Sequence, residues 1–461
     1  MNNSCLSPKT LLLLLFFINT AFLSSKTSTV VEALVPPSKT FKYVLSSLSG
    51  FDENDASNLL IPQIASHPFM LGFYSTTPNA YTFGLSMGYR LQKDAFPQPL
   101  RRWVWAANLK RPVNKNATLT FGADGNLVLA EASGRFAWQT RTRNKGVTDL
   151  KLLPNGNLVL LNKNGGVVWQ SFDHPTDTLL NGQSLRGDGS NKLVSGSYSM
   201  VVDVIVKRQF ITLFFNSKKK NSTEREMLSY HIIESFFASF DNVTFFVTPP
   251  GSSVFGRDVG NEIGLAFLGD PGDRTVWAQP KYNSTFSILQ LTPDGNLHVY
   301  TYNEIGNFGH EWQETYTYFS VNDCNLPEKC GVFGLCSNRQ CIACPTSKGL
   351  MGWSRKCRPE KLPPCTNTST SAGLVDYYKV KGMSSSLQRD RRDGMDFADM
   401  EIGECRKRCS ADCKCVAFFY RTQEQRCLMA NYELYTLKTD PEWDLVQEDN
   451  PEIDGYVKFA K

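Results

Sequence analysis

Cysteine is missing from most of this 461-residue chain. Cys5 stands alone near the start, residues 6–323 contain no cysteine, and the other twelve cysteines lie between Cys324 and Cys427. The first two thirds of the chain must therefore fold without disulfides. The last third has the cysteine density of a disulfide-stapled extracellular module.

Net charge and histidine are also scarce. The chain has 49 Lys and Arg against 44 Asp and Glu, a net +5, which does not require a polyanionic partner such as nucleic acid. It has five histidines, and its sequence contains no serine nucleophile elbow, zinc-protease helix or phosphate loop. Asp173 and Asp177 could be paired carboxylates for sugar hydrolysis, but their Pro-Thr-Asp context favours turn capping. We therefore expect no enzyme, no metal and no cofactor.

The sequence has one long apolar run, which lies near its start. Residues 11–18 follow Lys9 and are too few to cross a bilayer core, which takes about 20 residues. A charge before a short apolar stretch is typical of a secretory signal, although an apolar first helix of the mature fold is the alternative. We expect a signal peptide over residues 1–33, whose removal takes Cys5 with it and leaves an even number of cysteines.

No later run has 18 apolar residues, and the last residues do not form a lipid-anchor tail. The expectation is a secreted, extracellular protein without a membrane span. Sequons for N-glycosylation, which that compartment permits, occur at Asn116, Asn221, Asn242, Asn283 and Asn367.

An internal repeat organises the first half of the chain. Residues 119–140 match residues 150–171 at nine of 22 positions, at an offset of 31. Asp124-Gly125 and Asn155-Gly156 lie between alternating apolar runs and predict hairpins. One tryptophan recurs in each similar unit, at Trp105, Trp138 and Trp169. The spacing predicts a pseudo-threefold all-β domain whose tryptophans meet in a core.

Three stretches of the sequence resemble the plant bulb-type, mannose-binding lectin domain: Val104–Asn108, the Asp124–Leu129 unit and Trp169–Leu180. The last stretch is similar to a signature of S-locus glycoproteins and related receptor ectodomains. The resemblance implies a three-sided β-prism over residues 50–190, and a structural role for His174.

A degenerate second copy follows. Trp277 precedes Asp294 by 17 residues, where Trp105 precedes Asp124 by 19, and the segment between the two copies is rich in β-forming residues. We expect a second lectin-like domain over residues 191–320.

The sugar pocket of these lectins resembles Gln-x-Asp-x-Asn-x-Val-x-Tyr, which lines alternate side chains along one face of a strand. The three candidate sites read Gly122-x-Asp124-x-Asn126-x-Val128-x-Ala130, Leu153-x-Asn155-x-Asn157-x-Val159-x-Leu161 and Thr292-x-Asp294-x-Asn296-x-His298-x-Tyr300. None is complete, and a site built on hydrogen bonds loses discrimination when one partner is missing. The same Asp-Gly-Asn residues also suit a plain hairpin turn. We expect mannose binding to be absent or weak.

Residues 321–360 resemble an epidermal-growth-factor-like module with six cysteines. Six cysteines allow fifteen connectivities. The resemblance implies the pairs Cys324–Cys336, Cys330–Cys341 and Cys344–Cys357. A zinc site at Cys341-x-x-Cys344 is the rival, which the secretory signal and the lack of a matching second pair oppose.

Residues 365–461 resemble a PAN/apple domain of α+β type, on the strength of the cysteine-rich stretch from Glu404 to Phe418. The resemblance implies the pairs Cys405–Cys427, Cys409–Cys415 and Cys365–Cys413.

The expected molecule is mainly β: tandem bulb-lectin prisms, an EGF-like module and a PAN/apple domain. Related receptor kinases carry this array followed by a membrane span and a kinase, whereas this sequence ends after the PAN-like part. It resembles secreted, epidermis-type lectin-like glycoproteins of the plant apoplast and cell wall. We expect a non-enzymatic recognition module for wall glycans or receptor ectodomains. The alternative is a protein-interaction or receptor-competing module acting through the PAN domain, whose resemblance also implies a homodimer.

Overall fold

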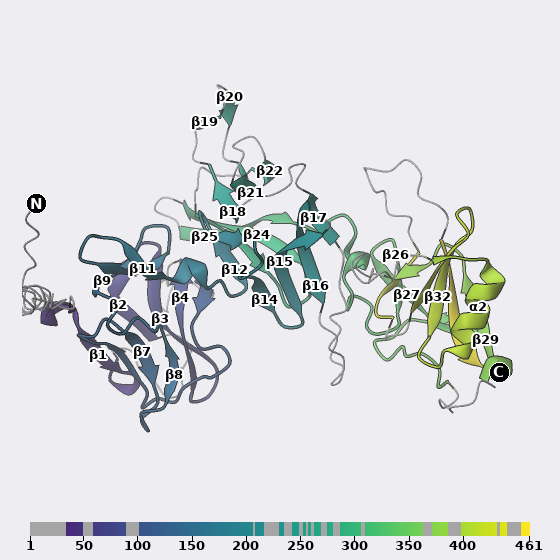
Figure 1. The fold of residues 1–461 in the computed structure, drawn as a ribbon, viewed down its shortest axis with the longest axis horizontal. Coiled ribbons are helices and arrows are strands. Elements are labelled where there is room, and N and C mark those ends of the chain that lie inside the picture. Colours follow the sequence, from purple (N-terminus) through teal and green to yellow (C-terminus); the bar gives the residue numbers. More distant parts are fainter. Residues whose placement is uncertain are drawn as a thin grey trace, which may run out of the picture.

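The computed structural model describes residues 34–48, 59–88, 101–205, 208–215, 230–234, 242–248, 252–254, 257–259, 262–268, 274–279, 286–305, 309–362, 371–385, 398–430, 434–439 and 453–461. The expected signal peptide, the sequons Asn221, Asn283 and Asn367, and Cys365 lie outside these residues. Figure 1 shows the described elements arranged in three parts along the long axis of the molecule.

The first part, here called the front unit, is built from three antiparallel sheets (Figure 1). In the order of their hydrogen-bonded neighbours, the strands are β1(Phe41–Val44)-β6(Thr118–Phe121)-β7(Leu127–Ala130)-β8(Phe136–Gln139), β2(Leu59–Ser66)-β3(Phe69–Thr77)-β4(Ala80–Met87)-β5(Arg102–Ala106), and β9(Val147–Leu152)-β10(Leu158–Asn162)-β11(Val167–Gln170).

The front unit folds as its repeat predicts. Leu127 and Leu129 point into the core while Val128 between them is half-buried, as alternation along a strand requires. The predicted hairpin turns at Gly125, whose φ of 75° is readily adopted by glycine. The three repeated tryptophan rings meet edge to face, at centroid separations of 5.8, 5.8 and 6.3 Å. Aromatic packing therefore organises a core that contains no disulfide.

The second part, the middle unit, repeats the three-sheet plan, with a small ribbon added. Its strands are β12(Thr178–Leu180)-β23(Ser287–Leu291)-β24(Leu297–Ile305)-β25(Gly309–Thr317), β13(Ser184–Arg186)-β18(Asn242–Val247)-β21(Ile263–Leu268)-β22(Arg274–Ala278), β14(Leu193–Ser195)-β15(Tyr198–Ile205)-β16(Arg208–Phe215)-β17(Tyr230–Glu234), and the ribbon β19(Ser252–Val254)-β20(Arg257–Val259). The expected mainly β fold is confirmed.

One sheet of the middle unit, β12-β23-β24-β25, separates two hydrophobic cores and is called the shared sheet below. Leu289 and Val299 on one face pack into a core that continues toward the C-terminal end, the rear core. Leu180, Ile288 and Tyr302 belong to the core of the front unit, the front core. The two units are therefore joined by a buried sheet.

Sheet membership also bears on the expected boundaries at residues 50 and 190. Strand β1 belongs to the front unit although it begins at Phe41, and β12 and β13 belong to middle-unit sheets although they precede residue 190. We propose residues 41–177 for the front unit and 178–317 for the middle unit.

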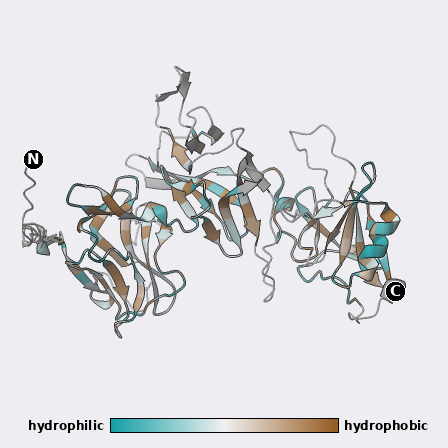
Figure 2. Cartoon of the chain, viewed as in Figure 1, coloured by the Kyte–Doolittle hydropathy of each residue, from teal (hydrophilic) through white to brown (hydrophobic). Residues whose placement is uncertain are grey.

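The third part combines the cysteine-rich segment with the PAN-like segment. Its strands are β28(Gly349–Gly352)-β27(Gln340–Thr346)-β26(Leu335–Ser337)-β34(Leu437–Lys438)-β30(Ser384–Ser385) and β29(Val375–Val380)-β35(Ile453–Ala460)-β32(Ala417–Arg421)-β33(Arg426–Ala430)-β31(Ala398–Asp399). Helix α2(Ile402–Ala411), the one α-helix among the described residues, packs on the second sheet. Figure 2 shows hydrophobic colour along its strands and a largely hydrophilic helix.

The disulfides lie in this third part. The structure pairs Cys324–Cys336, Cys330–Cys341, Cys344–Cys357, Cys405–Cys427 and Cys409–Cys415, which are the pairs that the family resemblance implies. Cys413 is also disulfide-bonded, and its expected partner is outside the described residues. The Cys341 and Cys344 thiols of the rival zinc site are consumed in two of these disulfides.

The two segments of the third part share one sheet, because β26 pairs in parallel with β34 about 100 residues later. The buried Thr436 hydroxyl donates to the Pro327 carbonyl at 2.8 Å, and the buried Lys438 ammonium donates to Asn325 Oδ1 at 2.7 Å. Phe333 and Leu437 both lie in the rear core. No helix in the described part of the chain is long and apolar enough to span a membrane.

Candidate functional site

The first candidate sugar motif uses its asparagine inside the protein. Asn126 is buried, and its Nδ2 donates to Gln139 Oε1 at 2.9 Å. Its Oδ1 accepts from the Thr140 hydroxyl at 3.0 Å and the Thr142 amide at 3.2 Å. Asp124 Oδ1 accepts from the Asn126 backbone N–H at 3.1 Å and so closes the turn. The side-chain amide of Asn126 therefore holds the hairpin to the following loop and has little capacity left for a sugar hydroxyl.

The second motif repeats this network at the 31-residue offset. Asn157 Nδ2 donates to Gln170 Oε1 at 2.8 Å, and its Oδ1 accepts from the Ser171 hydroxyl at 3.2 Å and the Phe172 amide at 3.3 Å. Asn157 is buried as well. The internal repeat therefore preserves a network of internal hydrogen bonds around the asparagine rather than a polar group available to a ligand.

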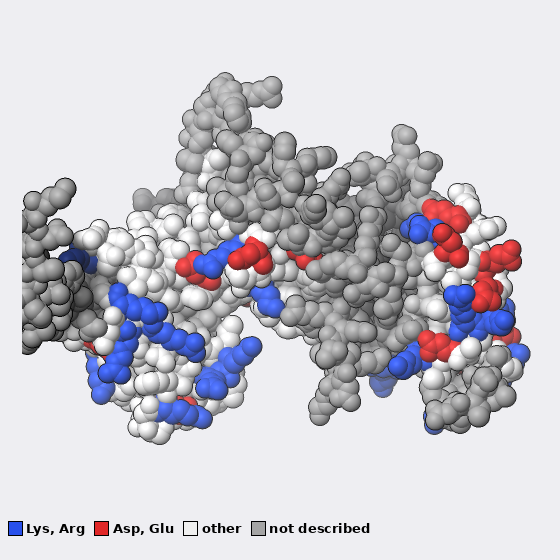
Figure 3. All heavy atoms as spheres, viewed as in Figure 1, with Lys and Arg blue, Asp and Glu red and all other residues white. Residues whose placement is uncertain are grey.

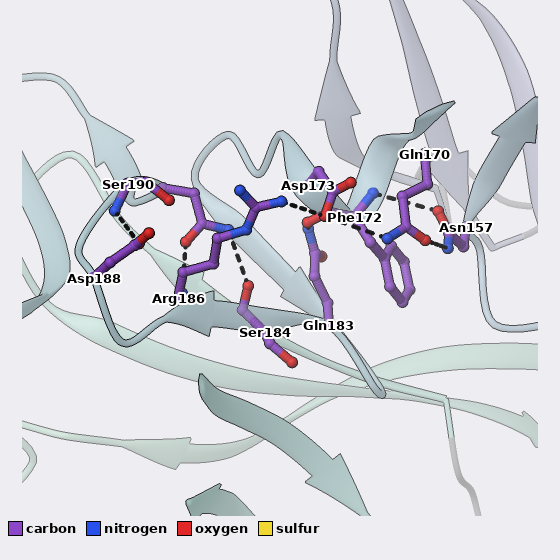
Figure 4. A network of polar contacts seen from close by, with 10 residues as sticks. Asn157, Gln170, Phe172, Asp173, Gln183, Ser184, Arg186, Asp188 and Ser190 are labelled. Atoms are coloured by element: carbon purple, nitrogen blue, oxygen red, sulfur yellow. Dashed lines mark hydrogen bonds and ion pairs between the residues drawn. The ribbon is translucent and has the colours of Figure 1, made fainter. Parts of the chain in front are cut away.

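The network continues from the second motif toward the middle unit (Figure 4). Gln170 Nε2 donates to Asp173 Oδ1 at 3.3 Å, and the Arg186 guanidinium donates to the same oxygen at 3.0 Å. Asp177 Oδ2 accepts from Gln290 Nε2 on strand β23 at 3.2 Å. The two carboxylates thus tie the front unit to β13 and β23 through separate partners.

His174 contacts the tryptophan core. Its ring stacks on Trp169 with centroids 5.5 Å apart, and its carbonyl accepts a hydrogen bond from Trp105 Nε1 at 2.8 Å. These contacts favour the structural role implied by the family resemblance.

The third motif follows the same pattern at its turn. The Thr292 hydroxyl and the Asn296 amide both donate to Asp294 Oδ1, at 2.6 and 3.1 Å. The buried Asn296 Oδ1 accepts from the Phe319 amide at 3.1 Å. In all three motifs, therefore, the asparagine accepts a hydrogen bond from a backbone amide beyond its own hairpin.

The tyrosine of the third motif faces the front unit. The Arg102 guanidinium lies 3.7 Å from the Tyr300 ring centroid and 5.2 Å from that of Trp312. The ring of His298, two residues earlier in the motif, stacks on the Tyr300 ring with the two centroids 5.6 Å apart. Burial raises the pKa of Tyr300, and Arg102 opposes that rise. Tyr300 is thus engaged in the interface between the units.

The outer face of sheet β1-β6-β7-β8 carries the first motif. Lys42, Thr120, Val128 and Gln139 lie side by side in one row across its four strands. Phe136, which is 54% exposed, pairs with Ala130, the position where the lectin motif has tyrosine. This row brings polar, basic and aromatic side chains together on an outer face.

Sequence reasoning missed three parts of this arrangement: the glutamines Gln139 and Gln170, the row beginning at Lys42, and the contact of Arg102 with Tyr300. The glutamines are among the nine identities of the repeat, so their signal was present. Lys42 and Arg102 had no signal, because nothing local indicates which distant strand packs beside a motif.

Comparison with known proteins identifies two domains. The D-mannose binding lectin family model matches residues 103–199, and the PAN-like domain model matches residues 378–437. A solved structure described as a novel monomeric monocot mannose-binding lectin from Gastrodia elata covers 29% of this chain and 96% of its own, at 20% identity and a TM-score of 0.17, too low to support any inference.

Two curated relatives match over most of their length. EP1-like glycoprotein 2 of Arabidopsis thaliana is 38% identical over 449 residues, covering 89% of this chain and 94% of its own. The epidermis-specific secreted glycoprotein EP1 of Daucus carota is 40% identical over 400 residues, covering 78% and 95%. The chain is a lectin-like protein with a PAN-like domain, and it belongs to the EP1-like glycoprotein family.

Proposed function

We propose that this protein is a secreted plant glycoprotein of the apoplast or cell wall that recognises glycans without catalysing a reaction on them. The observation that carries the proposal is the row of Lys42, Thr120, Val128 and Gln139 on the outer face of a lectin-family sheet. Hydroxyl, amide and ammonium groups beside an apolar floor are suited to hydrogen-bond the hydroxyls of a pyranose. The relative from carrot is named as a secreted glycoprotein, which supports the location.

Free mannose is not the expected ligand. The first motif has Gly122 and Ala130 where the lectin pattern has glutamine and tyrosine, and its Asn126 bonds internally. In the third motif, Tyr300 lies under Arg102. A titration calorimeter should therefore detect no heat of binding at millimolar mannose.

A second candidate function is protein interaction through the C-terminal part. Ile342 and Met351 are 45% and 54% exposed on the neighbouring strands β27 and β28. They share one face, because Met351 pairs with Cys344, two residues from Ile342. Exposed apolar side chains that lie together are typical of an interaction surface. A receptor ectodomain or a second copy of the chain would then bind here.

A glycan array probed with the full-length protein and two variants tests the first function and locates the surface that carries it. Thr120→Glu places a negative charge on the outer row of the front unit, and Met351→Glu places the same charge on the C-terminal apolar face. We expect glycan binding to be lost in Thr120→Glu and kept in Met351→Glu, with both variants unfolding near the wild-type temperature.

The reverse pattern would place glycan binding on the C-terminal part instead of the outer row, and no glycan binding by the wild type would contradict the first function. Point variants are preferable to deletion of the PAN-like domain, because Phe333 and Leu437 share the rear core and removal of one segment would expose the other.

A further inference from the structure

The positive charge of the chain is concentrated in the front unit. Residues 101–163 contain eleven Lys and Arg against three Asp and Glu, a net +8 where the whole chain is +5. Figure 3 shows blue side chains spread over the front unit with few red ones among them. The near-neutral total therefore hides a basic segment of the front unit that is suited to attract anions.

Three of these cations follow strand β8 in one loop, here called the basic loop: Arg141, Arg143 and Lys145. All three are exposed, while Thr142 between them is buried. The Thr142 hydroxyl donates to the Gly125 carbonyl at 2.7 Å, and its amide donates to Asn126 Oδ1 at 3.2 Å. The backbone of the loop is thus anchored on the first motif while its charged side chains point outward.

The backbone conformation of this loop is unusual for its residues. Arg141 and Asn144 have φ values of 59° and 56°, a left-handed region that arginine rarely adopts. The Asn144 amide donates to the Asp124 carbonyl at 2.8 Å and helps to hold this path. A loop fixed in such a conformation presents its cations at defined positions, which lowers the entropy lost on binding.

Most of the charge of the basic loop is uncompensated. Arg143 Nε lies 3.4 Å from Asp124 Oδ2, and the Arg143 side chain is still 76% exposed. Arg141 and Lys145 have no ion pair within the described residues. On the neighbouring sheet, Lys39 and Lys151 share the single carboxylate of Asp149, at 2.7 and 3.7 Å. The cations therefore outnumber the carboxylates in both places.

The loop at the equivalent place in the second repeat serves as an internal comparison. After Gln170 the chain continues Ser171-Phe172-Asp173-His174, so that at the 31-residue offset Phe172 and His174 stand in place of the two arginines and a carboxylate lies between them. Asp173 is bound to Arg186. The two repeats share the hydrogen bonds of their asparagines but not the positive charge of the following loop, so the basic loop is an addition to the shared fold.

We propose that the basic loop and the adjoining outer face of sheet β1-β6-β7-β8 bind an acidic polysaccharide, specifically a polyuronate. This inference rests on the proposed glycan-recognition function and names its ligand class. Arginine pairs with a carboxylate through two parallel hydrogen bonds, and cations spread along a unit match a polymer that repeats its carboxylate. Thr120 and Gln139 offer partners for sugar hydroxyls, and exposed Phe136 offers a flat apolar surface for a ring face.

Polygalacturonate and its methyl ester form a matched pair of probes, because esterification removes the charge and leaves the sugar backbone. Affinity is measured by biolayer interferometry for the full-length protein at low and physiological salt. We expect polygalacturonate to bind at least about tenfold more tightly than the ester and to weaken as salt rises. The variant Arg141→Gln/Arg143→Gln/Lys145→Gln should lose about tenfold in affinity.

The matched control, Arg355→Gln/Lys356→Gln/Lys361→Gln, removes the same charge from exposed positions in the third part of the molecule and should retain wild-type affinity. Thermal unfolding of both triple variants near the wild-type temperature verifies their folding. Equal affinity for the ester, or equal loss in both triple variants, would overturn the proposal.

A third probe, poly-L-glutamate, distinguishes a sugar polymer from an acidic polypeptide. Binding as tight as that of polygalacturonate would show that charge alone is recognised and would overturn the assignment to a polyuronate. If neutral glycans bind on the array while polygalacturonate does not, only this inference fails. If no glycan of either kind binds, the proposed function fails with it.

Discussion

Three asparagine side chains show how one residue can suit two opposite interpretations. Asn126, Asn157 and Asn296 occupy the position that a lectin uses for sugar, and each is buried and bonded within the protein. The sequence placed them correctly at hairpin ends. Alternation along a strand could not reveal their bonding, because it specifies a face and not what lies against that face.

Replacing Asn126 with alanine should destabilise the front unit. The change leaves the half-buried Gln139 Oε1 without its donor and the buried Thr142 backbone amide without its acceptor. Such unsatisfied groups cost about 1–3 kcal/mol of the free energy of unfolding. Urea unfolding followed by tryptophan fluorescence measures this loss. The exposed Asn164→Ala serves as the control, and equal stability of the two variants would contradict the fastening role.

Tyr198 should make stability fall at alkaline pH. Burial, with Glu328 close by, raises the pKa of this tyrosine well above 10, and its hydroxyl lies 3.4 Å from Glu328 Oε2. Above pH 10 the unfolded chain releases the proton while the folded chain keeps it, so stability declines with rising pH by up to about 1.4 kcal/mol per pH unit.

Tyr198→Phe removes this contribution, so its unfolding free energy should fall less steeply above about pH 10 than that of the wild type. A residual slope is expected, because burial also raises the pKa of Tyr316 and Tyr377. Urea titrations at several pH values measure both slopes, and parallel curves for the two proteins would rule this assignment out.

At the scale of elements, the hairpin turns depend on glycine in two separable ways. Gly295 (φ 89°) and Gly134 (φ 82°) both adopt left-handed conformations. A Cβ atom on Gly295 would come within 2.4 Å of the Tyr198 ring, whereas one on Gly134 meets no atom within 4 Å. The first turn therefore requires space as well as conformation, and the second requires conformation alone.

Alanine at both positions separates the two requirements. Gly134→Ala should cost about 1–2 kcal/mol from backbone strain. Gly295→Ala should cost about 1–3 kcal/mol more, because the ring of Tyr198 must move. Denaturant unfolding of the paired variants measures the difference, and equal losses would show that the core around Tyr198 adapts freely.

The fold was predictable from sequence where its signals are local and repeated. The 31-residue offset predicted the hairpins at Gly125 and Gly156 and the meeting of the three tryptophans. The pairing of β26 with β34 was not predictable, because its partners are about 100 residues apart and each strand is short. The contact of Arg102 with Tyr300 was not predictable for the same reason, because no local sequence pattern indicates which residues of another unit lie against a motif.

At the scale of the whole molecule, the front and middle units are coupled through the shared sheet and through Arg102. The guanidinium of Arg102 lies over Tyr300 and beside Trp312. A partly buried cation–π contact contributes about 0.5–2 kcal/mol. The two units should therefore unfold together more closely than covalent linkage alone requires.

Arg102→Ala should separate the unfolding of the two units in a calorimetric scan and lower the first transition, while Arg102→Lys should retain part of the coupling. Arg135→Ala, which removes an exposed cation elsewhere on the front unit, serves as the control. An unchanged scan for Arg102→Ala would assign all of the coupling to the shared sheet.

The shared sheet also determines when the front core can be completed during biosynthesis. Leu180 on β12 belongs to the front core, yet Ile288 on β23 leaves the ribosome about 100 residues later. At roughly 5–20 residues per second, that delay lasts roughly 5–20 s. During this interval the nascent front unit lacks Ile288 and Tyr302, which complete its core, so the newly made chain carries an unfinished apolar surface that is open to aggregation.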